Sequence, residues 1–139
     1  MRKAMLRATD PFVGTWKLNR AKSKFFKGAP KEWTDIYREV ADSKLEVTAK
    51  IVLPDGSSLN ERLVYPRQGG AAIFLQGGGN GIYEVETMIT PYEWLGTRMK
   101  DGRQIGLMRM VVSKDGETMR YIMRLTDLEV EGEAVFDRQ

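Results

Sequence analysis

Regular alternation of apolar and polar residues is the feature that most constrains the fold of this chain. In the run KLEVTAKIVL, residues 44–53, every second residue from Leu45 onward is apolar, and most residues between them are polar. Successive side chains of a strand point to opposite faces, so a period of two predicts a strand with one buried face. The pattern recurs along most of the chain, and no segment sustains the 3.6-residue period of a helix. We therefore expect an all-β protein.

Short turn sequences separate the alternating runs. PDGS at 54–57, KDGR at 100–103 and SKDGET at 113–118 each place an Asp-Gly pair between two runs. Glycine adopts the positive φ that tight hairpins require, so these segments predict antiparallel hairpins. A meander of hairpins leaves two edge strands, and closure into a barrel removes them.

The expected architecture is an antiparallel up-and-down β-barrel of about 8–10 strands. We expect one domain over residues 1–139, in which residues 1–9 are flexible. Residues 21–26 lack alternation and precede Gly28 and Pro30, so at most one short helix is expected there, near the N-terminus.

The absence of two residue types limits the chemistry. The sequence contains no cysteine and no histidine. This excludes disulfides, thiolate nucleophiles, histidine-ligated metals and Ser-His-Asp triads. Any catalysis must use carboxylates, tyrosine, lysine, arginine, serine or threonine, and we expect no metal and no cofactor.

Charge and hydropathy exclude further classes. The 22 basic and 19 acidic residues are interspersed, which does not favour nucleic acid as a partner. No apolar run approaches the roughly 18 residues of a membrane span, so none is expected. The start MRKAMLRATD lacks the apolar core of a signal peptide. We expect a cytoplasmic protein, with export open if a leader has been trimmed.

The glycine-rich run at 77–81 invites comparison with a phosphate-binding loop. Such a loop lies between a strand and a helix, whereas the following IYEVETMI alternates as a strand. We expect a flexible hairpin loop here, with a lid over a cavity mouth as the alternative.

Two terminal segments carry a resemblance to a known family. GTW at 14–16, at the start of the first expected strand, resembles the Gly-x-Trp signature of lipocalins and related calycin barrels. The longer DPFVGTWKLNRAKSKF at 10–25, with VVSKDGETM and AVFDRQ near the end, resembles a group of bacterial lipocalin-like proteins, most of them uncharacterised. The resemblance implies that Gly14 lets the first strand bend, that Trp16 plugs the closed end of the barrel, and that Arg138 packs across Trp16.

A barrel of this size has an interior that holds one small ligand, lined by alternate residues of each strand. In KEWTDIYREV, one face carries Trp33, Asp35, Tyr37 and Glu39, and the opposite face carries the residues between them. Either face can look inward. If the first does, burial would raise the carboxyl pKa values and suit them to proton transfer.

A second strand offers a clearer inward carboxylate. Glu61 interrupts the apolar row of Leu59, Leu63 and Tyr65, and a lone acid in such a row requires a partner. Arg98 and Arg109 are the candidates for that partner.

The favoured function is binding of a small apolar or aromatic molecule in the cavity of a monomer or homodimer. The expected ligand-binding residues are aromatic, basic and thioether side chains at Trp33, Tyr37, Tyr65, Tyr83, Trp94, Arg98, Arg109, Tyr121 and Met123. The alternative is a cofactor-free isomerase, cyclase, lyase or hydrolase with Glu61, Asp35 and Glu39 as general acids or bases, supported by tyrosine or arginine. A third reading is an interaction domain with a filled interior.

Overall fold

The computed structural model describes residues 10–41 and 43–139, so the expected flexibility of residues 1–9 falls outside it. Eleven strands and one short 3-10 helix form within these residues. The strands are β1 Gly14–Leu18, β2 Lys24–Lys27, β3 Glu32–Val40, β4 Lys44–Val52, β5 Ser58–Pro66, β6 Gly70–Gln76, β7 Ile82–Thr90, β8 Glu93–Lys100, β9 Arg103–Val112, β10 Thr118–Leu125 and β11 Val130–Arg138.

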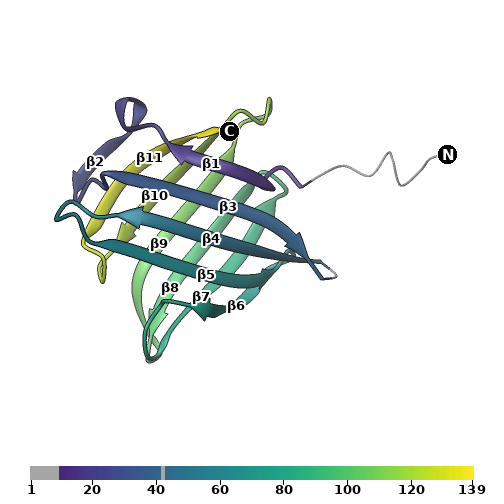
Figure 1. The fold of residues 1–139 in the computed structure, drawn as a ribbon. Helices are drawn as coiled ribbons and strands as arrows, with labels where there is room; N and C mark the ends of the chain where they lie inside the picture. Colours follow the sequence, from purple (N-terminus) through teal and green to yellow (C-terminus); the bar gives the residue numbers. More distant parts are fainter. Residues whose placement is uncertain (1–9, 42) are drawn as a thin grey trace.

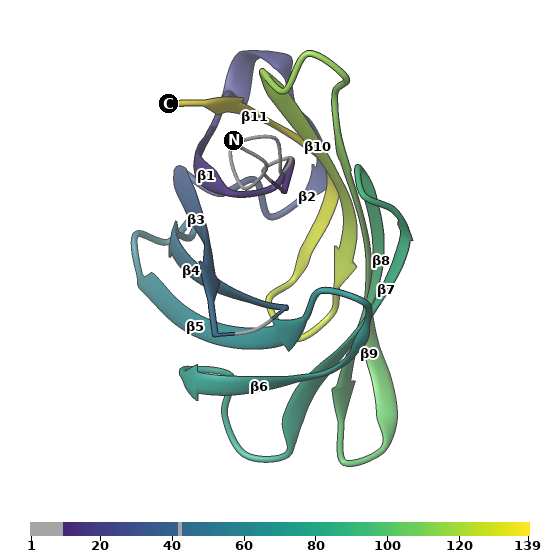
Figure 2. The same ribbon diagram turned by 90° about the vertical axis from the view of Figure 1, so that its right-hand side faces the viewer.

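The strands close into an antiparallel barrel. From β3 to β11 each strand pairs with the next along the chain, and β1 pairs with both β3 and β11. These ten strands form the ring, with β3 to β5 crossing in front of β8 to β11 in Figure 1. The ring is seen from a second side in Figure 2. The prediction of an all-β up-and-down barrel is confirmed.

The first two strands share one edge of β11. β1 pairs with its C-terminal half, at Leu18 and Phe136, while β2 pairs with its N-terminal half, at Phe25 and Gly132. Between them lies the 3-10 helix η2, Arg20–Lys22, and the Val135 amide donates to Ser23 Oγ across this break. The helix expected at 21–26 is therefore a three-residue turn, and Lys24–Lys27 form a strand because the exposed edge of β11 offers backbone partners.

The predicted hairpins are confirmed. β4 and β5, β8 and β9, and β9 and β10 pair around the three Asp-Gly turns, and Gly56, Gly102 and Gly116 all have positive φ. The glycine-rich run joins β6 to β7 as a hairpin loop rather than leading into a helix, while its role as a lid stays a prediction. No helix within the described residues has the length and apolar character needed to cross a bilayer.

Contacts between Trp16 and Arg138 hold β1 and the segment before it against the end of β11. Trp16 is fully buried, its Nε1 donates to the Phe12 carbonyl at 2.9 Å, and the Arg138 guanidinium lies 4.3 Å from its ring centroid. Arg138 also donates to the carbonyls of Pro11 and Val13, each at 2.7 Å. Gly14 has φ +139°, and a Cβ there would collide with Arg138 Nη1. The expected packing of Arg138 across Trp16 is confirmed.

Aromatic side chains fill the barrel next to the Trp16–Arg138 contact. Phe12 is fully buried and packs on Tyr37 and Trp94, and Trp94 packs edge-on against Tyr65 at a centroid distance of 5.1 Å. Arg67, in the turn after β5, binds Asp10 at 2.9 Å and ties the segment before β1 to the wall. The polar part of the interior lies beyond this aromatic layer.

Candidate functional site

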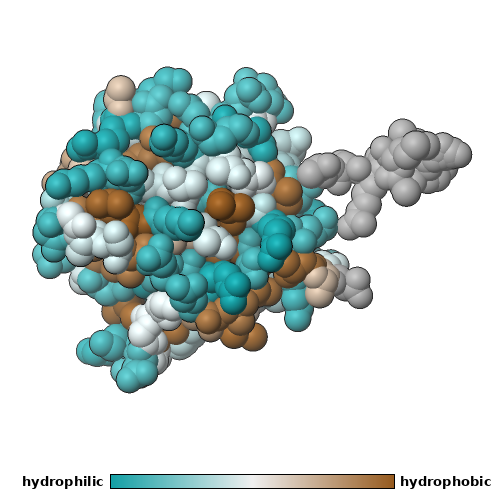
Figure 3. Space-filling model, in the orientation of Figure 1, coloured by the Kyte–Doolittle hydropathy of each residue, from teal (hydrophilic) through white to brown (hydrophobic). Residues whose placement is uncertain are grey.

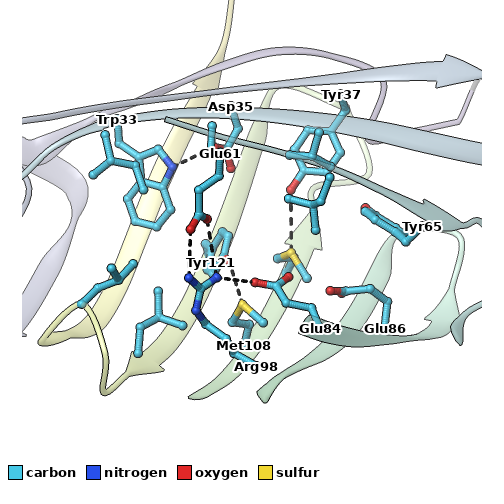
Figure 4. A pocket seen from close by; sticks show the side chains of 17 residues that line it. Trp33, Asp35, Tyr37, Glu61, Tyr65, Glu84, Glu86, Arg98, Met108 and Tyr121 are labelled. Atoms are coloured by element: carbon cyan, nitrogen blue, oxygen red, sulfur yellow. Dashed lines mark hydrogen bonds and ion pairs between the residues drawn. The ribbon is translucent and has the colours of Figure 1, made fainter. Parts of the chain in front are cut away.

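A cavity of about 50 Å³ lies inside the barrel. Inward side chains of β3, β4, β5, β7, β8, β9 and β10 line it, with Leu128 from the turn before β11. The described lining combines four carboxyl groups, Asp35, Glu61, Glu84 and Glu86, with a single guanidinium, Arg98. Figure 4 shows these groups gathered between the aromatic side chains. The lining is thus more acidic than the apolar cup expected from the sequence.

Arg98 is the centre of a buried ion-pair network. Its side chain is 3% exposed, and it donates to Glu61 at 2.9 Å, to Glu84 at 2.8 Å and to Asp127 at 2.9 Å. These acids come from β5, β7 and the turn between β10 and β11, so one guanidinium links three parts of the barrel. Burial alone would lower the pKa of Arg98, but hydrogen bonds and charge interactions with its acidic partners raise it.

Of the two expected partners for Glu61, the structure provides Arg98. Arg109 lies on the outer face of β9, with its side chain 51% exposed and bound to Glu93 at 2.7 Å. Met108 and Met110 occupy the inward positions on either side of it. The expectation that Arg109 faces the cavity is therefore corrected.

The face of β3 that carries Trp33, Asp35 and Tyr37 points into the barrel. Trp33, Asp35 and Tyr37 are buried and line the cavity, and Trp33 Nε1 donates to Asp35 Oδ1 at 2.7 Å. Burial raises the pKa of Asp35 to about 7 against the opposing effect of that hydrogen bond, and the charges of Glu61 and Glu84 add to the rise.

Glu39, the remaining acid of that face, does not reach the cavity. It lies near the end of β3, is exposed, and accepts from Arg67 Nη1 at 2.8 Å. A strand that extends past the packed interior presents its terminal inward positions to the rim instead. The placement of Glu39 among lumen carboxylates is therefore corrected.

Two acids of β7, Glu84 and Glu86, belong to the site although sequence reasoning did not name them. Both are buried, whereas Tyr83 and Val85 between and beside them are each 37% exposed. Tyr83, expected as a ligand-binding residue, therefore points outward. β7 therefore points its acids inward and its more apolar residues outward, the reverse of the usual pattern. The pairing of Glu84 with Arg98 across the β7–β8 hairpin was the signal that could have indicated this.

The carboxyl group of Glu86 is incompletely satisfied. Glu86 is 3% exposed, and its Oε1 has no hydrogen-bond partner among the described residues. Gly96 faces it across the β7–β8 pair, and a Cβ at that glycine would lie 2.8 Å from Glu86 Oε1. Burial raises the pKa of Glu86 well above its ordinary value, and the Glu84 carboxylate raises it further. Both effects favour the protonated form of Glu86.

Tyrosines complete the wall. Tyr37 and Tyr121 are buried, and each donates its hydroxyl to a methionine sulfur, Met110 at 3.7 Å and Met108 at 3.0 Å. Burial raises the pKa of Tyr37, Tyr65 and Tyr121 well above its usual value. These phenols therefore remain neutral and act as aromatic surface and hydrogen-bonding groups.

Two other expected ligand-binding residues are buried away from the cavity lining. Trp94 is 1% exposed and packs on Tyr65 and Phe12, and its Nε1 has no partner among the described residues. Met123 is 3% exposed and lies under a separate outer groove of about 720 Å³. Both residues support the barrel wall.

Apolar residues also occupy parts of the outer surface. The outer groove carries the exposed Phe26, Leu95, Leu107 and Ile122. A separate area includes Ile73 and Leu75 of β6, and Figure 3 shows apolar side chains along the lower edge of the view, where β5 and β6 lie. This outer apolar surface explains why hydrophobicity alone assigned some strand faces incorrectly.

The acidic residues do not form a metal centre. Among the residues described, no group of three or more acidic side chains has an arrangement suited to holding a metal ion. The carboxyls around Arg98 are engaged by its guanidinium instead.

Comparison with known proteins identifies the fold. No family model matches the chain, and no curated protein matches it. Among solved structures, a mutant of the fluorescent protein UnaG is similar with a TM-score of 0.59 and 15% identity over 93% of this chain and 96% of that one. A redesigned β-barrel, mFAP1, bound to DFHBI is similar with a TM-score of 0.52 and 9% identity over 92% and 95%. This chain therefore has the fold of the lipocalin-like small β-barrels.

Proposed function

We propose that this protein binds a small molecule inside its barrel. The observation that carries the proposal is the cavity beside Arg98, lined by four carboxyl groups and aromatic side chains. A buried ion network adds little to stability compared with apolar residues of the same volume, because desolvation of the charges opposes their attraction. The similar barrel mFAP1 is described as bound to DFHBI, which supports the use of this fold for ligand binding.

The lining indicates a ligand with both flat or apolar and polar parts. Trp33, Tyr37, Tyr65 and Tyr121 offer aromatic faces for stacking. The buried carboxyls require a polar group, because an apolar molecule would leave them without partners. The expected apolar or aromatic ligand is thereby narrowed to one that also carries a polar substituent.

The size of the cavity sets a condition on binding. A volume of about 50 Å³ has room for a few water molecules, so a larger ligand must displace side chains. Met108 and Met110 line the cavity, and their unbranched thioethers rotate at low cost. The methionines allow the interior to widen without breaking the ring of strands.

Binding is better supported than the catalytic alternative. Glu61 is engaged by Arg98, and Glu39 lies outside the cavity against Arg67. Asp35 has a pKa suited to proton transfer, but no nucleophile or oxyanion-stabilising pair is assembled around it in the described structure.

A cavity-filling variant tests the proposal. Ala49 is buried and lines the cavity, so Ala49→Leu places extra carbon atoms where the ligand would lie. Native mass spectrometry of the gently purified wild type should show an added small-molecule mass that denaturation removes, and Ala49→Leu should lose it while circular dichroism stays unchanged. Ala71→Leu, at an exposed position of β6, is the matched control. Equal retention of the added mass by Ala49→Leu would contradict binding in this cavity.

A further inference from the structure

We propose that the molecule bound in the barrel is a small organic cation, an ammonium or guanidinium compound, and that Glu86 and Asp35 are the groups that receive its charge. This inference rests on the proposed binding function and narrows its ligand class. It does not rest on the acidic cluster alone.

The excess of carboxyl groups over basic groups in the cavity lining is the first step. Four carboxyl groups face one guanidinium among the described lining residues. Arg98 binds Glu61 and Glu84 in the cavity and Asp127 at its edge. Asp35 and Glu86 are left without an ion pair to it.

The second step is the unsatisfied oxygen of Glu86. This side chain is 3% exposed and lines the cavity, and its Oε1 meets no hydrogen-bond partner in the described structure. Natural proteins rarely leave a buried polar atom unpaired unless something else binds there. Figure 4 shows the Glu86 carboxyl beside that of Glu84, so a donor entering the cavity meets both.

The third step concerns the sign of the ligand charge. An anionic ligand would have to compete with three carboxylates for the donors of Arg98 and would face the surplus of acids. A cation gains an ion pair with Glu86 or Asp35 and can lie against the faces of Trp33, Tyr37 and Tyr65. The described acids do not offer a metal-ion arrangement, which favours an organic cation.

Binding of such a cation should displace a proton from Glu86. Burial and the nearby Glu84 raise the pKa of Glu86, which favours its protonated form when no ligand is bound. When a cation binds, the carboxyl O–H bond breaks, its electron pair stays on the carboxylate, and the proton passes to the solvent. Affinity should therefore rise with pH.

The other groups facing this site modify the exchange without reversing it. From β3, β5, β7, β8 and β10 these are Asp35, Tyr37, Glu61, Tyr65, Glu84, Arg98 and Tyr121. The tyrosines stay neutral, and Arg98 stays charged. Asp35, with a pKa of about 7, releases its proton in the same direction as Glu86.

Three ligands of nearly equal shape distinguish the possibilities by isothermal titration calorimetry: benzylammonium, benzyl alcohol and benzoate. Benzylammonium should bind at least about tenfold more tightly than the other two and more tightly at about pH 8 than at about pH 6. Titration in phosphate and in Tris should give different apparent enthalpies, because the released proton is taken up by the buffer.

Variants separate the charge of Glu86 from its volume. Glu86→Gln keeps the shape of the side chain and adds no charge to the buried site, so the barrel should fold. It should weaken benzylammonium at least about tenfold and remove the buffer dependence, with little effect on benzyl alcohol. Glu133→Gln, at a partly exposed position of β11, is the control and should leave both unchanged.

The outcomes separate the two proposals. If benzyl alcohol or benzoate binds as tightly as benzylammonium, the cation assignment is overturned while binding in the barrel stands. If none of the three binds and the purified wild type carries no added mass, both proposals fail. Equal binding of benzylammonium by wild type and Glu86→Gln overturns the role of Glu86.

Discussion

Glu84 and Arg98 face each other across the β7–β8 pair and meet inside the barrel in an ion pair of 2.8 Å. The same guanidinium reaches Glu61 on β5 and Asp127 beyond β10. A single side chain therefore joins opposite sides of the ring, and its removal should affect more than one contact.

Replacement of Arg98 should lower the free energy of unfolding. Arg98→Met retains much of the side-chain volume but leaves Glu61 and Glu84 buried without their partner, and breaking such a network costs about 3–5 kcal/mol. Urea unfolding at neutral pH should show this loss. Arg109→Met, on the outer face of β9, is the matched control and should change stability by no more than about 0.5 kcal/mol. A comparable effect of both variants would contradict the structural role of Arg98.

The stability of the barrel should depend on the protonation of Asp35. Its pKa is about 7 in the folded state and 3.8 as a model value, so folding takes up a proton between these values. The free energy of unfolding should fall as pH rises from about 4 to about 7 and then level off, with at most about 4 kcal/mol from this group.

Asp35→Asn isolates that contribution. The amide oxygen still accepts from Trp33 Nε1, so the local geometry is kept. Urea unfolding across this pH range should show a shallower fall than in wild type, with the remaining slope due to Glu84 and Glu86. An unchanged slope would mean that Asp35 is ionised in the folded protein.

The contacts of Arg138 with Trp16 and with the segment before β1 should stabilise the barrel. Arg138→Met removes the contact with the Trp16 ring and the hydrogen bonds to the Pro11 and Val13 carbonyls. A loss of about 2–3 kcal/mol in the free energy of unfolding is expected. Arg120→Met, an exposed residue of β10 paired with Glu133, should have little effect.

The turn before β11 should loosen when its link to the interior is cut. Asp127 accepts from Arg98 Nε at 2.9 Å and anchors residues 126–129. Asp127→Asn weakens this charge-assisted bond, so amide hydrogen exchange in the turn should accelerate while the strands keep their protection. Exchange of the Thr126 and Glu129 amides is the measurement. Glu131→Gln, on the adjoining strand, provides the comparison.

The sequence was sufficient to predict most of the fold but only part of the site. Alternation and Asp-Gly turns identify local strands and hairpins, which depend on neighbouring residues. Which face of a strand points inward depends on its position in the closed ring. Glu61 was recognised because it interrupts an apolar row, and its partner Arg98 was among the two candidates.

The face of β7 shows why the remainder was not predictable. Tyr83 and Val85 are more apolar than Glu84 and Glu86, so hydrophobicity favours burial of the wrong pair. Arg98 on the facing strand changes this balance, because it supplies buried acids with a charged partner. The same reasoning applies to β9, where Leu107 and Arg109 share an outer surface and the methionines turn inward.

The pairing of β1 with β11, which closes the ring, has a consequence for synthesis of the protein. β1 lies near the beginning of the chain, yet one of its two neighbours is β11, and the Gln139 amide donates to the Thr15 carbonyl. The ring therefore cannot close before the residues of β11 have left the ribosome. Until then, the acids of the nascent interior are in contact with water and ionised. Closure of the ring buries Asp35 and Glu86, and burial raises the pKa of both carboxyl groups, so completion of the barrel favours their protonation.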